Sequence, residues 1–224
     1  MKRHRRFLSR AILACHASLA LFAFSVGEAR AADTRPHGAD TSYGRIEGDL
    51  SAALGLGATF GPRAPRGSAE LRLRYLDTVG AFFTYEDGFG GSAEPERVVT
   101  MGAEIRPLFI ARWLQGLEFG TPRLDLALDS FGLELGAFFA QPHGDTFGAR
   151  RGLQAGIGLE VPILAHASGP WIGLHGGVRW SDDALGGAPI SGPSDRSAYL
   201  SVTFAWHAFF GAHVVDMRDR RGEP

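Results

Sequence analysis

Apolar and polar residues alternate with a period of two along most of this chain, from residue 45 to about residue 210. In the segment RIEGDLSAALGLGATF (45–60), Ile46, Leu54 and Phe60 fall on one face, while charged, polar or small residues fall on the other. A period of two is the pattern of a β-strand, because successive side chains of a strand point to opposite faces. The segment therefore predicts one strand with an apolar face and a polar face.

Seven further segments repeat this alternation, and helical periodicity is nearly absent. The stretches between them are rich in Gly, Pro, Asp and Ser, as is typical of turns. The pattern predicts an all-β fold, a single up-and-down antiparallel β-barrel of about eight strands that covers residues 44–210. The expected strands are 45–60, 69–75, 79–85, 99–105, 130–139, 152–163, 171–181 and 198–209.

Residues 107–129 fit this rhythm least well. The segment is long for a turn and apolar at several positions. It indicates either a short helix or an extension of the flanking strands.

Two architectures suit eight such strands, a transmembrane barrel and a soluble periplasmic barrel that binds an apolar ligand inside, and they place opposite faces inside. The outward face of a soluble barrel should carry long polar side chains, but here the polar set is rich in Gly, Ala and Ser, with few charges per strand. Small residues and paired charges suit the narrow lumen of eight strands, and the apolar set suits lipid. The transmembrane barrel is therefore favoured. The aromatics expected in its interfacial girdles are Phe60, Tyr75, Tyr85, Phe139, Trp171, Trp180 and Phe209.

The first 31 residues form the pattern of a cleaved signal peptide. A basic start, MKRHRRFLSR, precedes an apolar run, and small residues at Ala29 and Ala31 predict cleavage after Ala31. A membrane anchor is the alternative, although the run is short for a spanning helix and His16 interrupts it. Arg10 lies too close before Cys15 for a lipoprotein signal. The expected organisation is a signal peptide (1–31), a short lead (32–43), a transmembrane barrel (44–210) and a polar tail (211–224).

Removal of residues 1–31 leaves 17 basic and 23 acidic residues, a net charge of −6. This balance argues against nucleic acid as a partner. The one cysteine of the chain, Cys15, is removed as well, so the exported chain has neither a disulfide nor a thiol nucleophile.

In strand number, strand length and alternation, residues 44–210 resemble the small eight-stranded outer-membrane barrels of the OmpA and OmpX transmembrane type. The resemblance is one of architecture and involves no specific motif. It implies a location in the outer membrane of a Gram-negative-type bacterium, with the lipid bilayer as the partner. The chain departs from these barrels in two places. Such barrels usually end on an aromatic residue, but here residues 211–224 follow Phe210. Their periplasmic turns are usually short, but residues 107–129 are long for such a turn.

One constellation could be catalytic. The outer-membrane lipid A deacylases, which are eight-stranded barrels, carry a His-x-Ser pair and an acidic partner, and HASGP offers His166 and Ser168. A serine activated by a histidine and a carboxylate is acyl-hydrolase chemistry. The asparagine that follows the serine in that family is absent, and Asp182 and Asp183 are the nearest acids in place of its glutamate. HASGP also suits a plain turn.

Three histidines, His175, His207 and His213, could be metal ligands. His175 and His207 fall on the inward face of strands that should be neighbours, where a histidine more often belongs to a polar core network. We therefore expect no catalytic residue, no cofactor and no metal site. The expected function is that of a non-enzymatic barrel with a polar, side-chain-filled interior, structural or adhesive through its exposed loops.

Overall fold

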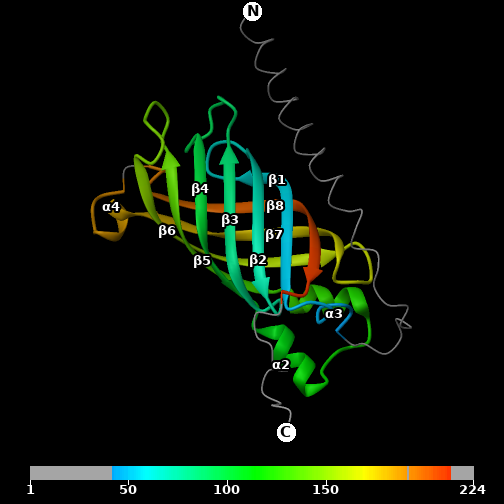
Figure 1. The fold of residues 1–224 in the computed structure, drawn as a ribbon. Coiled ribbons are helices and arrows are strands. Elements are labelled where there is room, and N and C mark those ends of the chain that lie inside the picture. The colour runs from blue at the N-terminus through cyan, green and yellow to red at the C-terminus, as the bar shows by residue number, and fades with distance from the viewer. Residues whose placement is uncertain (1–41, 191, 213–224) are drawn as a thin grey trace, which may run out of the picture. The chain divides into compact units, whose positions relative to one another are not determined.

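Eight strands and three helices make up the part of the chain that the computed structural model describes, residues 42–190 and 192–212 (Figure 1). The predicted signal peptide and most of the lead and tail lie outside these residues. The strands are 9 to 15 residues long, and a strand that crosses a bilayer needs about 9–11. In chain order the elements are β1 (Leu50–Phe60), β2 (Arg66–Tyr75), β3 (Val79–Asp87), β4 (Arg97–Ile105), α2 (Leu108–Gln115), α3 (Pro122–Asp129), β5 (Gly132–Gln141), β6 (Arg150–Pro162), β7 (Gly169–Ser181), α4 (Asp182–Leu185) and β8 (Arg196–Phe210).

The strands form a closed barrel, which confirms the predicted fold class. Each strand pairs antiparallel with the next, and β1 pairs with β8, so no strand has a free edge. The register keeps residues of one face side by side, as Leu54 shows by lying opposite Leu71 on β2 and Trp206 on β8. All three of these side chains are exposed, so the apolar face continues from strand to strand.

The apolar face of the alternation points outward, as predicted. On β1, Ser51, Ala53 and Thr59 are buried, whereas the side chains of Leu54 and Leu56 remain 41% and 51% exposed. The same division holds on the other strands, where the largest buried side chains include three arginines and a glutamate. A soluble protein buries its apolar residues and leaves its charges outside. In this barrel the apolar side chains are outside and the charged side chains are inside.

Residues 107–129 form helices and do not extend the strands (Figure 1). Pro107 lies at the start of α2, and Gly116 ends that helix in the left-handed conformation (φ 63°) that glycine adopts most readily. Pro122 occupies the first turn of α3, where its missing N–H is not needed. We call residues 107–129, which contain α2, α3 and the connection between them, the helical cap. The end of the barrel where β1 begins and β8 ends is the capped end. The opposite end, which carries α4, is the loop end.

Strand β1 begins at Leu50, so residues 45–49 lie outside the strand that their alternation indicated. They form turns at the capped end instead. Arg45 keeps its inward direction and is 1% exposed, and its guanidinium is bound by the helical cap.

Candidate functional site

The interior of the barrel is a dense network of acids and arginines. Inward positions on six strands supply the charged groups, and all of these side chains are buried. Such charges are tolerated away from water only when each is paired and hydrogen-bonded. The members nearest the centre are Glu70, Arg72, Arg74, Glu104, Arg106, Glu134, Glu160, His175 and His207.

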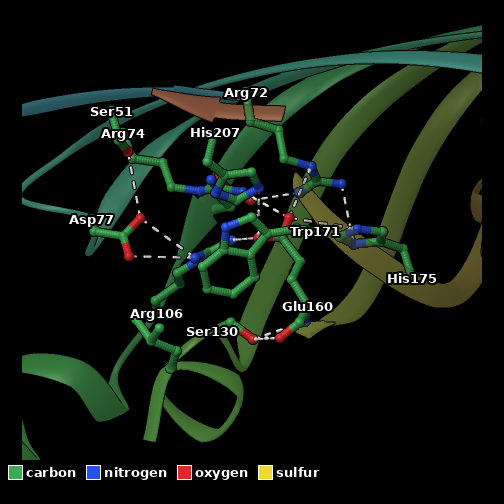
Figure 2. A network of polar contacts seen from close by, with 12 residues as sticks. Ser51, Arg72, Arg74, Asp77, Arg106, Ser130, Glu160, Trp171, His175 and His207 are labelled. Atoms are coloured by element: carbon green, nitrogen blue, oxygen red, sulfur yellow. Dashed lines mark hydrogen bonds and ion pairs between the residues drawn. The ribbon is translucent and has the colours of Figure 1, made fainter. Parts of the chain in front are cut away.

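Arg72 on β2 is the centre of this network. Its Nη1 donates to Glu134 Oε1 at 2.7 Å and to Glu104 Oε2 at 2.5 Å, and its Nη2 lies 3.1 Å from Glu70 Oε2. His175 Nδ1 also lies 3.1 Å from Nη2 (Figure 2). One guanidinium therefore links side chains of four other positions on β2, β4, β5 and β7.

Glu160 on β6 is the second centre. Arg74 Nη2 donates to its Oε1 at 3.1 Å, and Arg106 Nη2 donates to its Oε2. Ser130 exchanges hydrogen bonds with the Glu160 backbone, accepting from the amide at 2.8 Å and donating to the carbonyl at 2.7 Å (Figure 2). Asp77, from the turn between β2 and β3, lies 3.4 Å from Arg106 Nη1. These contacts join Glu160 of β6 to Ser130, the residue that follows α3, and to Arg74 and Arg106.

A second group of charges lies toward the loop end. Glu86 on β3 accepts from Arg66 Nε at 2.9 Å and from Arg179 Nη1 at 3.1 Å. The Arg179 guanidinium also donates to Gln154 Oε1 at 2.7 Å and lies 4.4 Å from the ring centre of Tyr199. Between the two groups remains a cavity of about 20 Å³, which is room for one water molecule. The described interior is therefore filled by side chains, as an eight-stranded barrel allows.

The helical cap closes the other end with its own charged cluster. Arg45 Nη1 donates to Asp129 at 2.5 Å, and its guanidinium lies 4.5 Å from the ring centre of Phe109. Arg112 donates to Asp125 at 2.6 Å and to Asp129 at 2.5 Å. Tyr43 Oη donates to Asp125 at 3.0 Å. Helices α2 and α3 are thus joined to each other and to residues 43–45, which precede β1.

These contacts change the pKa values of the groups in the cap cluster. Partial burial and the hydrogen bond to Asp125 raise the pKa of Tyr43 to about 12. Burial alone would raise the pKa of Asp125, but the Phe119 amide and the Arg112 guanidinium lower it below its usual range. The carboxylates accordingly raise the pKa of Arg112 despite its desolvation. The cluster is therefore held in its ionised form with a neutral phenol beside it.

His175 and His207 lie on the neighbouring strands β7 and β8 and point inward, as predicted. His175 Nδ1 lies 2.9 Å from Glu134 Oε1. His207 stacks on Trp171, with ring centres 4.7 Å apart, and its Nε2 lies 3.4 Å from Glu160 (Figure 2). Within residues 42–190 and 192–212, no group of three or more His, Cys, Asp or Glu side chains is placed to hold a metal ion. His213 lies outside the described residues.

His166 and Ser168 lie together in the turn between β6 and β7, but their contact is not that of a catalytic pair. The backbone amide of Ser168 donates to His166 Nδ1 at 3.1 Å, while Nε2 faces Glu47 Oε1 at 3.4 Å. Both ring nitrogens of His166 therefore already have a partner other than the serine hydroxyl. Asp182 and Asp183 begin α4 at the loop end, with the whole of β7 between them and His166.

Two of the aromatics expected in the girdles lie inside. Trp171 is 1% exposed and donates from Nε1 to the Ala167 carbonyl at 2.9 Å, and it packs with Leu126 of α3. Phe209 packs against the same cluster. Trp171 is an even number of residues from His175, and Phe209 from His207, so the alternation places both aromatics on the inner face. The expectation of girdle positions for these two residues is therefore wrong.

The exterior of this barrel requires an apolar solvent. Every strand exposes Leu, Ile, Val, Phe or Trp side chains on its outer face, while the charged network is enclosed. Closure pairs the backbone groups between neighbouring strands, which is what permits a sheet to lie in hydrocarbon. The fold and its two faces define a membrane-spanning β-barrel with a filled, charged interior. Among the described helices, none is both long and apolar enough to cross a membrane.

No protein-family model and no curated protein matches this chain. Among solved structures, it is similar to the N-terminal β-barrel domain of Pseudomonas aeruginosa OprF, with 10% identity and a TM-score of 0.40 over 70% of this chain and 97% of that one. It is also similar to Neisserial surface protein A (NspA), with 12% identity and a TM-score of 0.34 over 70% of this chain and 94% of that one. The class of membrane-spanning barrel follows from the closure of the sheet and from its exposed apolar face.

Proposed function

We propose that this protein is a non-enzymatic outer-membrane barrel that acts as a rigid scaffold for the loops at its loop end. The observation that carries the proposal is the reversal of its two faces, apolar outside and charged inside. In a bacterium with two membranes, closed barrels of this kind belong to the outer one. Cleavage of the signal peptide after Ala31 would deliver the chain there.

The filled interior supports a scaffold more than a pore or a binder of apolar ligands. A cavity of about 20 Å³ lined by charged and polar side chains has no room for an apolar ligand. The network also links strands that are not neighbours, such as β2 and β5 through Arg72 and Glu134. Cross-links of this kind oppose deformation of the barrel, which keeps the loop ends at fixed separations.

The loop end supports a role in recognition. Four connections converge there, residues 61–65, 88–96, 142–149 and 182–195. A hollow of about 200 Å³ lies among them, lined in part by Arg63, Glu94, Asp145 and Arg150. Loops held by a rigid scaffold are where proteins commonly place their binding residues. We infer that these loops face outward from the cell and bind a partner, which is an adhesive role.

The scaffold proposal predicts how the protein migrates during electrophoresis. Material from outer-membrane fractions should migrate differently before and after boiling, because a closed barrel with paired strands and a cross-linked interior stays folded in detergent until it is heated. The fractionation itself tests the location. Recovery of the protein in the freely soluble periplasmic extract, with no change of mobility on heating, would contradict the proposal.

A further inference from the structure

The helical cap carries an exposed apolar surface opposite a charged cluster that faces the barrel. Its charged side chains Arg112, Asp125 and Asp129 point toward one another and toward Arg45. Phe109 and Leu126 are buried, but most of the other large apolar side chains of the cap point away, and Leu114 and Phe119 are 70% and 66% exposed. The apolar side chains exposed on the cap are Trp113, Leu114, Leu117, Phe119 and Leu124. A helix pair that bordered only water would not expose this many large apolar side chains together.

The cap is joined to the barrel next to exposed apolar residues of the outer face. Ile105, the last residue of β4, is exposed on the outer face, and α2 begins three residues later. Leu133 on β5 is also exposed on the outer face and follows the end of α3 by four residues. Both chain connections of the cap therefore leave the barrel beside its lipid-facing rim.

The chemistry of this surface suits the headgroup region of a bilayer. Trp and Phe side chains favour the boundary between acyl chains and headgroups, and short amphipathic helices lie in that boundary with their apolar face toward the lipid. The cap also exposes Arg123 and Gln115, which can reach headgroups or water. Arg112, in contrast, is shielded by two carboxylates and by the Phe119 ring, which lies 5.2 Å from its guanidinium.

We infer that the helical cap is an interfacial lipid-binding element, which rests on the membrane location proposed above. The cap lies in the headgroup region of the leaflet at the capped end, with Leu114, Leu117 and Phe119 toward the acyl chains. It anchors the rim of the barrel at a fixed depth while its charged inner face closes the lumen.

Fluorescent labels on single cysteines test this inference in the full exported chain. The chain without residues 1–31 contains no cysteine, so each variant carries one label. The test position is Leu114→Cys, with Leu117→Cys as a second position on the cap. The lipid control is Leu56→Cys on the outer face of β1, and the water control is Thr146→Cys in an exposed loop at the loop end. Each variant is first checked for the mobility shift on heating and then reconstituted into phosphatidylcholine vesicles.

Nitroxide-labelled lipids should quench the label at positions 114 and 56 but not at 146, with a shallow nitroxide more effective at 114 and a deep one at 56. A water-soluble quencher should act mainly at 146. The inference would be overturned if the labels at positions 114 and 117 were quenched by the aqueous reagent alone while the label at position 56 was still quenched by the lipids. That result would leave the membrane location intact. Protection of 114 from both quenchers would show a protein partner or a second copy on the cap and would also overturn it. Loss of lipid quenching at 56 would refute the membrane location itself.

Discussion

Arg72 compensates more negative charge than any other single side chain near the centre of the barrel. Its guanidinium binds Glu70, Glu104 and Glu134, so Arg72→Met would leave buried carboxylates without their cation. Breaking a buried ion pair from one side costs about 3–5 kcal/mol. We expect a loss of that order in the free energy of unfolding, measured by urea titration of the protein in detergent micelles.

A matched control for this prediction lies on β4. Arg97 also pairs with a carboxylate, Asp87 at 3.1 Å, but its side chain is half exposed. Arg97→Met should therefore cost about 0–1 kcal/mol. Adding Glu134→Gln to Arg72→Met should restore part of the loss, because one uncompensated charge is removed. Equal losses for Arg72→Met and Arg97→Met would show that the interior pairs do not hold the barrel together.

The direction of each side chain on the strands could be predicted from the sequence, but its partners could not. A period of two fixes that Arg72, Glu134 and His175 share the inner face, and all three are buried there. Arg72 on β2 meets Glu134 on β5, although these strands are not neighbours. That contact depends on the closure and stagger of the whole sheet, which no local pattern contains. The expectation that Trp171 lies in a girdle is wrong for another reason. Its position in the alternation is that of the inward His175, and an aromatic side chain near a strand end fits either face.

At the scale of elements, the eight strands were predictable, whereas a helix was only one of two alternatives for residues 107–129. Residues 107–129 have helix boundaries in Pro107, Gly116 and Pro122, but their apolar residues suit either a helix or an extended strand. The usual rule that the apolar side chains of a helix point to the protein interior holds here only in part. Phe109 and Leu126 are buried, but Leu114 is exposed and Arg112 is turned inward. The reversal of faces on the strands could be recognised because eight segments repeat it.

The phenol of Tyr43 reports on the attachment of the cap. Its pKa is about 12 in the folded protein, against 10.0 for an ordinary tyrosine, because burial and Asp125 disfavour the phenolate. Between pH 10 and 12 the folded state therefore keeps a proton that the unfolded state has lost. The stabilisation from this group is complete below pH 10 and is lost as the pH rises toward 12.

Ultraviolet titration of the tyrosines in the folded protein should show this late transition, and Tyr43→Phe should remove it. Asp125→Asn should move the Tyr43 transition part of the way back toward pH 10, because it deletes the negative charge while keeping an oxygen that can accept the hydrogen bond. Cleavage of residues 107–129 by protease should also quicken over the same pH window. A transition that does not respond to Asp125→Asn would refute the contact between Tyr43 and α3.

At the scale of the whole molecule, the reversal of faces predicts that stability depends on the lipid. Leu54 lies near the middle of β1 and is exposed, with Leu71 and Trp206 beside it on the same face. An arginine at the centre of the bilayer costs about 2–4 kcal/mol and near its surface about 0–1 kcal/mol. Leu54→Arg should therefore destabilise the protein strongly in vesicles, and the more so as the bilayer is made thicker.

Two substitutions on the same strand serve as controls. Phe60→Arg is on the same outer face but at the end of β1, so its cost should be small and should vary with the depth at which that end lies. Ser51→Arg is on the inner face beside Asp77, where a long side chain overfills a packed lumen. Its cost should be the same in thin and thick bilayers, because the interior does not contact lipid. The measurement is urea unfolding in vesicles of phosphatidylcholines that differ in chain length. If the Leu54→Arg loss is independent of thickness and Ser51→Arg is silent, then the outer face is not in lipid, and the assignment of inside and outside must be reversed.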